Sequence, residues 1–185
     1  MSMNLLNSPE NLEKLIAIVP DFPTKGVLFR DITPLLASSE GFALAIDALV
    51  QDIDLSEIDC IAGIESRGFI LAAALAVKFN KGFLPIRKKG KLPQPVISQS
   101  YNLEYGTDVL EMRPYKPVSE AIAKKPQILV VDDVLATGGT IAAALKLCEK
   151  AGYFVKDISF LINLVYLNTF QWQQTRPKAV FSYKT

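Results

Sequence analysis

Apolar segments of two kinds alternate along this chain. Some lack polar alternation, as expected of strands buried on both faces of a sheet, and the clearest are CIAGIE (60–65) and QILVVD (127–132). Alanine-rich segments with helical spacing follow them, over residues 67–80 and 138–152. Further apolar strands are expected toward the C-terminus. This order predicts an α/β protein with a mainly parallel central sheet flanked by helices.

Two stretches interrupt the alternation. Near the N-terminus, a helix is expected from Pro9 to Val19, and a proline-containing, turn-rich segment follows it. A second helix fits Ser39 to Asp52. Residues 88–116 begin as a polar loop and continue with alternating polar and apolar positions, which predicts a flexible lid with an antiparallel β excursion. Without a clear linker, a single domain of residues 1–185 is expected.

Composition excludes several classes of function. The chain has 185 residues, 50% of them hydrophobic, and a formal net charge of +1, so no global basic field recruits nucleic acid or an anionic membrane. The chain contains no histidine, so acid–base chemistry must use Asp, Glu, Lys or Tyr. No secretory signal is recognisable and the apolar runs are too short to span a bilayer, which predicts a cytoplasmic protein.

The second apolar strand runs directly into two carboxylates, Asp132 and Asp133. Small residues follow at the turn into the next helix: Ala136, Thr137, Gly138, Gly139 and Thr140. Unpaired N–H groups and the helix dipole favour a phosphate at such a turn, and glycine lets the backbone approach it closely. The carboxylates suit vicinal hydroxyls, or a metal ion and its waters. The two halves together predict a site for a phosphorylated sugar, whereas an acidic cap with glycines for geometry is the alternative.

Here the chain resembles a known family. ILVVDDVLATGGT is similar to the 5-phosphoribosyl-1-pyrophosphate (PRPP) signature of type I phosphoribosyltransferases. In content and order, FPTKGVLFRDITP, IAGIESRGF, IRKKGKLP and SYNLEYG resemble the members that act on adenine. The resemblance implies a small β-rich hood within residues 1–35 and a lid at about 88–116. It also implies a Mg²⁺-dependent homodimer that converts adenine and PRPP to AMP and pyrophosphate in purine salvage.

The resemblance assigns roles to the residues around PRPP. Asp132 and Asp133 would hold ribose hydroxyls, and residues 136–140 the 5-phosphate. Mg²⁺ would be held mainly by PRPP and water, with the two aspartates as candidate contacts. Pyrophosphate would be bound at a strand end and at a basic cluster, by Glu65, Ser66, Arg67, Arg87, Lys88 and Lys91. By itself, such a cluster is typical of a solvated charge run, but beside pyrophosphate it would neutralise charge.

The resemblance also assigns the acceptor pocket and the lid. Backbone groups of Leu28 would meet the edge of adenine, with Phe29 and Arg30 lining the pocket. Backbone donors and acceptors can distinguish a 6-amino from a 6-oxo purine. Tyr101 and Tyr105 would lie on the lid, together with the sole assigned catalytic residue, Glu104, which would exchange a proton at purine N7.

One segment departs from the family, and two other functions compete. The segment ISFLINLVYLNTFQWQQ (158–174) lacks the acidic residue and the glycine expected after this strand. The rival enzymes use hypoxanthine, guanine, xanthine or orotate as acceptor. The rival of another class is a PRPP-sensing regulator without turnover, which the charge balance disfavours because such a protein carries a nucleic-acid-binding segment.

Overall fold

The computed structural model describes residues 9–102, 106–117, 124–173 and 176–185, and the structural statements below concern these residues. The chain forms two compact units, Met1–Ala48 and Leu49–Thr185, which are described separately. The hood expected within residues 1–35 falls in the first unit. The single domain expected over residues 1–185 stays a prediction.

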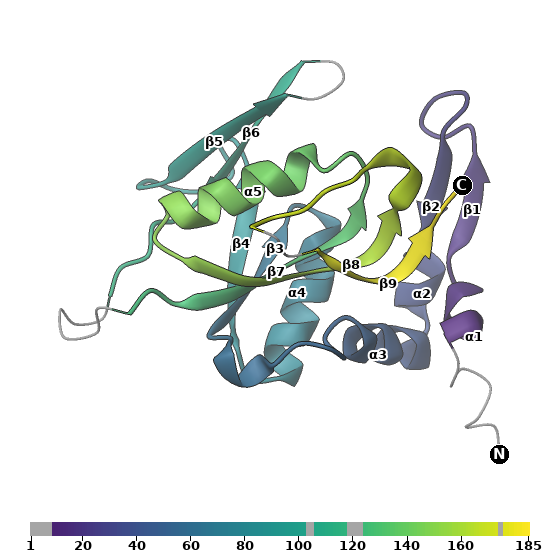
Figure 1. The fold of residues 1–185 in the computed structure, drawn as a ribbon, viewed down its shortest axis with the longest axis horizontal. Helices are drawn as coiled ribbons and strands as arrows, with labels where there is room; N and C mark the ends of the chain where they lie inside the picture. The colour runs from purple at the N-terminus through teal and green to yellow at the C-terminus, as the bar shows by residue number, and fades with distance from the viewer. Residues whose placement is uncertain (1–8, 103–105, 118–123, 174–175) are drawn as a thin grey trace. The chain divides into compact units, whose positions relative to one another are not determined.

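A two-stranded hairpin and short helices make up the first unit (Figure 1). In the hairpin, β1 (Ala17–Pro20) pairs antiparallel with β2 (Leu28–Asp31), so Val19 lies opposite Phe29. The helices are α1 (Pro9–Glu13), α2 (Thr33–Ala37) and α3 (Ser39–Ala48).

Both helix predictions for this part of the chain extend too far. The helix predicted from Pro9 to Val19 ends at Glu13, because the β-branched Ile18 and Val19 join the hairpin instead. Pairing with β2 provides the backbone partners that a continued helix would have supplied. The helix predicted from Ser39 to Asp52 ends at Ala48.

The second unit is built on a twisted, mainly parallel sheet (Figure 1). Within the described residues, its strand order is β5-β6-β4-β3-β7-β8-β9, with antiparallel pairing only for β5 with β6 and β6 with β4. The strands are β3 (Cys60–Ile64), β4 (Gly82–Lys88), β5 (Ile97–Asn102), β6 (Thr107–Met112), β7 (Gln127–Leu135), β8 (Phe154–Leu164) and β9 (Lys178–Tyr183). The helices are α4 (Arg67–Lys78) and α5 (Gly139–Lys150), with 3₁₀ turns η1 (Leu55–Glu57) and η2 (Val165–Leu167). The predicted fold class is confirmed.

The two long helices follow the direction of the strand connections. Helix α4 links β3 to β4 and packs on β3, β4 and β7, whereas α5 links β7 to β8 and packs on β5, β6 and β8. The two connections leave the centre of the sheet in opposite directions, so right-handed crossovers place these helices on opposite faces. Residues Ile128–Val131 of β7 are fully buried between the two layers.

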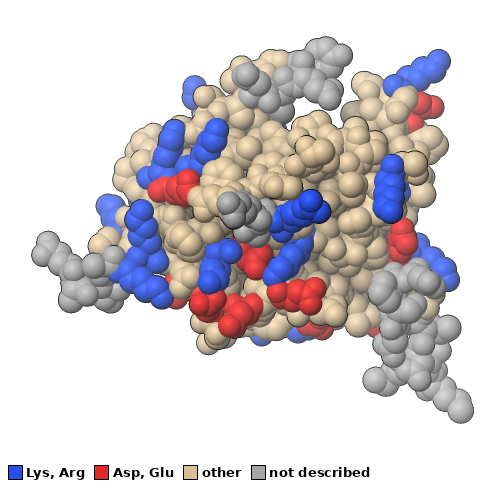
Figure 2. Space-filling model, in the orientation of Figure 1, with Lys and Arg blue, Asp and Glu red and all other residues tan. Residues whose placement is uncertain are grey.

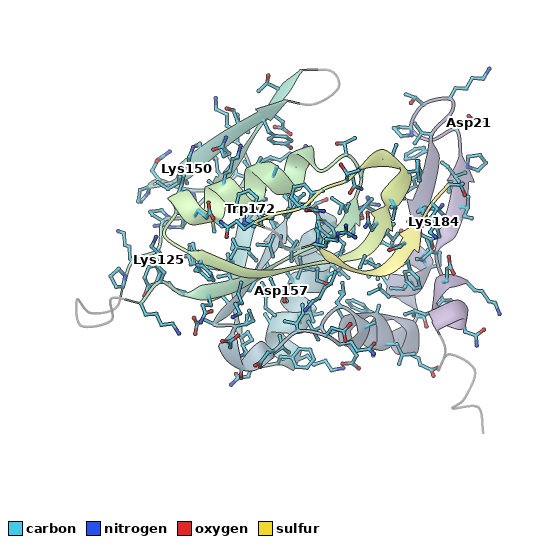
Figure 3. All side chains as sticks on the ribbon, in the orientation of Figure 1. Asp21, Lys125, Lys150, Asp157, Trp172 and Lys184 are labelled. Atoms are coloured by element: carbon cyan, nitrogen blue, oxygen red, sulfur yellow. The ribbon has the colours of Figure 1, made fainter. Side chains whose placement is uncertain are left out.

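The predicted lid contains the antiparallel hairpin β5–β6. Its pairing runs from Ile97 opposite Met112 to Asn102 opposite Thr107. Lys150, at the end of α5 and labelled in Figure 3, donates to the side-chain oxygen of Gln99 on β5 at 2.6 Å. The hairpin is thus joined to the helix that follows the acidic strand.

The charged surface carries both signs. Lys and Arg are interspersed with Asp and Glu over the face shown in Figure 2, in agreement with the net charge of +1. No helix in the described ranges has the length and apolarity needed to cross a membrane.

Candidate active site

A crevice opens in the sheet where β3 ends and β7 continues. The two strands pair in parallel up to Gly63 and Val131, whereas β7 extends to Leu135 beside β8. The crossovers diverge here, and such a switch point is where open α/β sheets bind ligands. The strand was expected to end at the aspartates. Asp132 and Asp133 instead lie within β7, on the stretch that β3 no longer pairs with.

Burial disfavours the charged forms of Asp132 and Asp133. Asp133 is 6% exposed, and its Oδ2 lies 2.7 Å from Nε of Arg67. Burial raises the pKa of Asp132 well above its usual range, and the adjacent charge of Asp133 raises it further. Burial also raises the pKa of Asp133, against the opposing effect of Arg67. Such perturbed carboxylates in a crevice are typical of a binding site whose ligand supplies hydrogen-bond donors or a cation.

Gly68, the second residue of α4, allows the helix to begin against these aspartates. A Cβ on Gly68 would lie 2.6 Å from Oδ1 of Asp132 and 3.0 Å from the carbonyl oxygen of Val131. Only a residue without a side chain fits there, since neither neighbour is the end of a long flexible side chain. Gly68 belongs to the motif IAGIESRGF, but the motif predicts no role for it, because the contact joins residues far apart in the chain.

The turn between β7 and α5 forms a small hollow. Gly138 has a φ of 89°, in the left-handed region that favours glycine, and α5 begins at Gly139. With Asp132 and apolar residues, four of the predicted phosphate-binding residues line a hollow of about 90 Å³: Ala136, Thr137, Gly138 and Thr140. The first N–H groups of the helix lack intrahelical acceptors, so this turn suits an anion.

A second, larger hollow lies on the other side of Asp132. It has a volume of about 450 Å³ and is lined by Glu65, Ser66, Arg67, Lys88, Asp132 and Asp133. These residues come from the connection between β3 and α4 and the start of that helix, from the end of β4 and from within β7, so the sheet brings together side chains that the sequence separates widely. Asp132 lines both hollows, which makes it the boundary between them.

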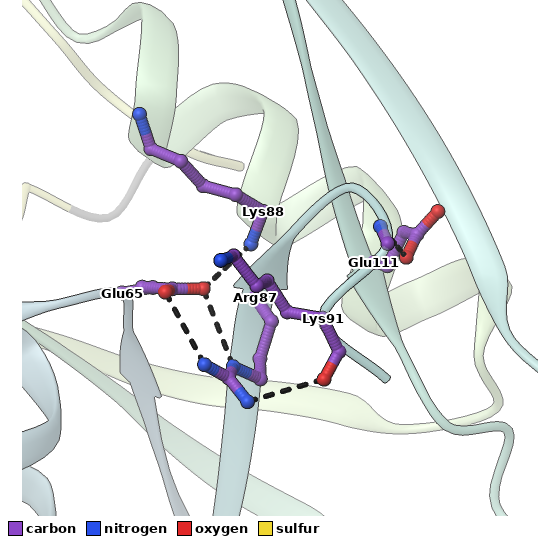
Figure 4. Close-up of polar contacts among 6 residues, drawn as sticks. Glu65, Arg87, Lys88, Lys91 and Glu111 are labelled. Carbon is purple, nitrogen blue, oxygen red and sulfur yellow. Dashed lines mark hydrogen bonds and ion pairs between the residues drawn. The ribbon is translucent and has the colours of Figure 1, made fainter. Parts of the chain in front are cut away.

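Glu65 organises the basic side of the larger hollow (Figure 4). Its carboxylate accepts from Nε and Nη2 of Arg87, each at 3.3 Å, and from the Lys88 backbone N–H at 2.9 Å. Desolvation alone would raise the pKa of Glu65, but the Lys88 amide and Arg87 lower it. Arg87 also donates to the carbonyl of Lys91 at 3.1 Å. The Glu65 carboxylate therefore faces the basic cluster.

Glu111 supports the same cluster from the lid strand β6. It is 6% exposed and accepts from the Gly90 backbone N–H at 2.9 Å (Figure 4). This bond fixes the turn that separates Lys88 from Lys91. The alternating polar and apolar positions around Glu111 predict only a strand, so the sequence indicates no role for this residue.

The lid strands carry one of the predicted lid tyrosines. The hydroxyl of Tyr101 donates to Oδ2 of Asp108 at 3.3 Å, and Nζ of Lys88 lies 3.1 Å from the same oxygen. Burial raises the pKa of Tyr101, and the hydrogen bond with Asp108 raises the pKa of Lys88. Glu104 and Tyr105 lie outside the described residues, so their assignments stay predictions.

The three residues assigned to adenine lie on β2 of the first unit. Leu28 is 40% exposed, whereas Arg30 is 7% exposed. The Phe29 ring meets Phe22 edge to face, with centroids 5.0 Å apart. Their role toward adenine stays a prediction.

The fold and the two hollows agree with a family of enzymes. A family model described as phosphoribosyl transferase domain matches residues 36–156. The chain belongs to this phosphoribosyltransferase family, as the sequence motifs predicted. An adenine phosphoribosyltransferase from Bdellovibrio bacteriovorus is 46% identical over 173 residues, which are 94% of this chain and 99% of that protein.

Solved structures give the same result. The crystal structure of adenine phosphoribosyltransferase from Rhodothermus marinus has a TM-score of 0.81 and 43% identity, covering 95% of this chain and 98% of its own. The enzyme from Trypanosoma brucei, in complex with AMP, pyrophosphate and ribose-5-phosphate, has a TM-score of 0.77 and 25% identity. That match covers 98% of this chain and 81% of the trypanosomal one.

Proposed function

We propose that this chain transfers the 5-phosphoribosyl group of PRPP to adenine and releases pyrophosphate, giving AMP in purine salvage. The adenine phosphoribosyltransferases to which it is similar over almost its whole length support this activity. The observation that carries it is the position of Asp132 between two hollows, one at a helix N-terminus and one lined by cations. PRPP has matching parts, because its ribose separates a phosphate from a diphosphate.

In this proposal, the small hollow takes the 5-phosphate. Backbone N–H groups at the start of α5 and the hydroxyls of Thr137 and Thr140 would donate to its oxygens. Asp132 and Asp133 would accept from the ribose hydroxyls. Their raised pKa values mean that donors from the substrate would relieve a cost already present in the free protein.

The larger hollow takes the diphosphate. Arg67 and Lys88 line it directly, and Glu65 holds Arg87 beside it. As the bond from ribose C1 to pyrophosphate breaks, negative charge grows on the leaving group, and fixed cations stabilise it. Backbone groups at Ser66, just before α4, would add donors to the same place.

Mg²⁺ would enter this site bound to PRPP. Asp132 and Asp133 supply adjacent carboxylates, but within the described ranges no group of three or more acidic, Cys or His side chains could hold a metal. The ion would therefore be held mainly by the diphosphate and water, with the aspartates contributing contacts. When bound, it would neutralise charge on the departing pyrophosphate.

The acceptor and the assembly complete the proposal. Leu28, Phe29 and Arg30 would bind adenine, and Glu104 would exchange a proton at N7 under a lid that carries Tyr101 and Tyr105. A homodimer is supported by large apolar side chains that are exposed on α4 and β4: Ile70 at 43%, Val77 at 85% and Phe83 at 38%. A lysine of residues 88–91 would reach the neighbouring subunit's site. A cytoplasmic location stays a prediction.

The activity is tested with a panel of purine bases. With PRPP and Mg²⁺, adenine should give AMP with a strong preference over IMP from hypoxanthine or GMP from guanine, because a site built to match a 6-amino purine leaves buried groups unpaired with a 6-oxo one. Chromatography of the nucleotides formed at equal base concentrations measures the preference. Equal or faster turnover of hypoxanthine would contradict adenine as the acceptor. PRPP binding without any turnover would favour the regulator.

Gly68→Ala should weaken PRPP binding by roughly tenfold or more, because the new Cβ must displace Asp132. Gly82→Ala is a matched control, since its Cβ would meet Sγ of Cys60 at 2.7 Å, away from the residues that line the two hollows. Both variants should lower the free energy of unfolding by about 1–3 kcal/mol. Calorimetric titration with PRPP measures the difference. Wild-type affinity in Gly68→Ala would show that this helix start does not position Asp132.

A further inference from the structure

The segment after β8 lacks the acidic residue and the glycine that the resemblance implies there, and it packs along α5 and the turn before it. Asn168 reaches Ala136, Phe170 covers Gly138, and Gln173 donates to the carboxylate of Glu149 at 2.9 Å. Trp172, labelled in Figure 3, packs against the hydrophobic core from the same segment. The segment therefore follows the turn and helix that form the smaller hollow, from one end to the other.

The amide of Asn168 uses both its donor and its acceptor atoms. Its Nδ2 donates to the carbonyl oxygen of Ala136 at 2.7 Å, and also approaches the Leu164 carbonyl at 3.0 Å and Oδ1 of Asn163 at 3.1 Å. Its Oδ1 accepts from the Phe170 backbone N–H at 3.1 Å. The shortest of these bonds joins the segment to the first residue of the turn. Because the side chain is partly buried and held on all sides, the bond has a fixed direction.

This bond sets the direction of a donor in the turn. The Ala136–Thr137 peptide is trans and planar, so its carbonyl and its N–H point in opposite directions. Holding the Ala136 oxygen toward Asn168 therefore directs the Thr137 N–H away from Asn168. Thr137 lines the 90 Å³ hollow, whereas Asn168 does not and instead lines a separate one of about 260 Å³.

Phe170 fixes the same turn two residues further on. A Cβ on Gly138 would lie 3.0 Å from Cδ2 of Phe170, so the ring packs closely against the Gly138 backbone. Phe170 also lines the separate hollow and not the smaller one. Two contacts from one segment thus restrain the turn from outside, and they leave the surface that faces the 90 Å³ hollow open to a ligand.

We propose that Asn168 is a positioning residue for the 5-phosphate: by holding the carbonyl of Ala136, it presents the N–H of Thr137 to the phosphate before the substrate arrives. This inference rests on the proposed function, because it deepens the use of the same hollow. It assigns a purpose to part of the chain that the family motifs did not cover. Preorganised donors cost no reorganisation when the anion binds, so loss of the restraint lowers phosphate affinity and leaves the distant diphosphate contacts intact.

The test compares Asn168→Asp with Asn168→Ala and Thr169→Ala. Asp keeps the size and the acceptor for the Phe170 N–H but loses the donor to Ala136, whereas Ala loses both. Thr169 is an exposed neighbour in the same segment and serves as the control. The probes are ribose 5-phosphate and, separately, pyrophosphate in calorimetric titrations, together with KM for PRPP, kcat and the melting temperature.

Asn168→Asp and Asn168→Ala should each raise Kd for ribose 5-phosphate and KM for PRPP by roughly three- to tenfold, as expected for one lost hydrogen bond. Kd for pyrophosphate and kcat should stay within about twofold of wild type, as should every value for Thr169→Ala. Because Asn168→Asp also adds a negative charge, a loss of affinity in this variant alone does not support the inference; if Asn168→Ala does not fold, Asn168→Leu, which has a similar size and neither charge nor donor, decides instead. Wild-type affinity of Asn168→Asp for ribose 5-phosphate would overturn the inference, and so would equal losses for both anions. If the wild-type protein forms no AMP from adenine and PRPP, the proposed function fails, and the inference fails with it.

Discussion

Replacing Asp132 and Asp133 together by asparagine should leave the fold intact and weaken PRPP binding by about 1–3 kcal/mol or more, as expected for lost charge-assisted hydrogen bonds. The fold should persist because burial already works against both charges, as their raised pKa values indicate. Calorimetric titration with PRPP and a melting curve measure the two effects. Asp157→Asn is a suitable control, because Asp157 also pairs with a cation, Lys178 at 2.9 Å, but lines neither hollow.

The same variant gives a pH test with a defined sign. Both pKa values are raised above the usual 3.8, so the folded protein keeps protons that the unfolded chain has already released. The stability contributed by the pair is present below pH 3.8 and is lost as the pH rises through the raised values. The wild-type protein should thus lose stability relative to the double variant as the pH rises above 3.8. Groups whose pKa is lowered instead, such as Glu65, are present in both proteins, so their contribution cancels in this comparison. Unchanged PRPP affinity, or parallel stability curves, would mean that the aspartates were misread.

Glu104→Gln should lower kcat and kcat/KM together, by roughly 10²–10⁴-fold if general acid–base catalysis is its whole effect. A proton exchanged at purine N7 only as the bond to ribose forms contributes mainly in the transition state. KM for PRPP should barely change, because the ribose and diphosphate contacts are made by other residues. Steady-state kinetics with adenine as the acceptor measures these values.

Lost lid closure could imitate lost chemistry in this variant, because Tyr101 and Tyr105 belong to the same lid. Single-turnover kinetics separates the two: a slow chemical step supports proton exchange, whereas normal chemistry with slow closure or release refutes it. Glu149→Gln removes a charge outside the two hollows and can still accept from Gln173, so it should behave as wild type. A smaller fall in kcat with a raised KM for adenine would reduce Glu104 to a binding role.

The central sheet was predictable because buried parallel strands have a recognisable local pattern, a continuous run of apolar residues. CIAGIE and QILVVD are apolar without alternation, since successive residues of β3 and β7, in the middle of the sheet, are buried on both faces. The hairpin β1–β2 has no such pattern. Residues Ala17–Pro20 continue the helical spacing of the preceding residues, and they become extended only because they pair with β2, several residues away. The end of β7 was missed for a similar reason, because pairing with β8 carries the strand past its own carboxylates to Leu135.

The residues of the site likewise fall into those with a local sequence pattern and those whose role depends on distant contacts. Asp132, Thr137 and Gly138 belong to one continuous motif whose chemistry is readable from neighbouring residues, and the structure gathers them at one hollow. Gly68 and Asn168 act through residues more than thirty positions away, on β7 and on the turn after it. No local pattern encodes such a contact, and an asparagine after an apolar strand reads as an ordinary turn residue. The sequence therefore contained no indication of the positions that support the two hollows, although it did indicate most of the residues that line them.

The contact between Lys88 and Asp108 has a consequence for the order of events during turnover. The ammonium group is 3.1 Å from a carboxylate of lid strand β6, and the two side chains are 55% and 23% exposed. An ion pair this open to water contributes at most about 1 kcal/mol, so a diphosphate can displace Asp108 at little cost. If the larger hollow takes the diphosphate, as proposed, arrival of the substrate would break the ion pair between Lys88 on β4 and Asp108 on β6, and departure of the product would restore it. Lys88 would then pair with Asp108 while the hollow is empty and with the diphosphate while it is filled.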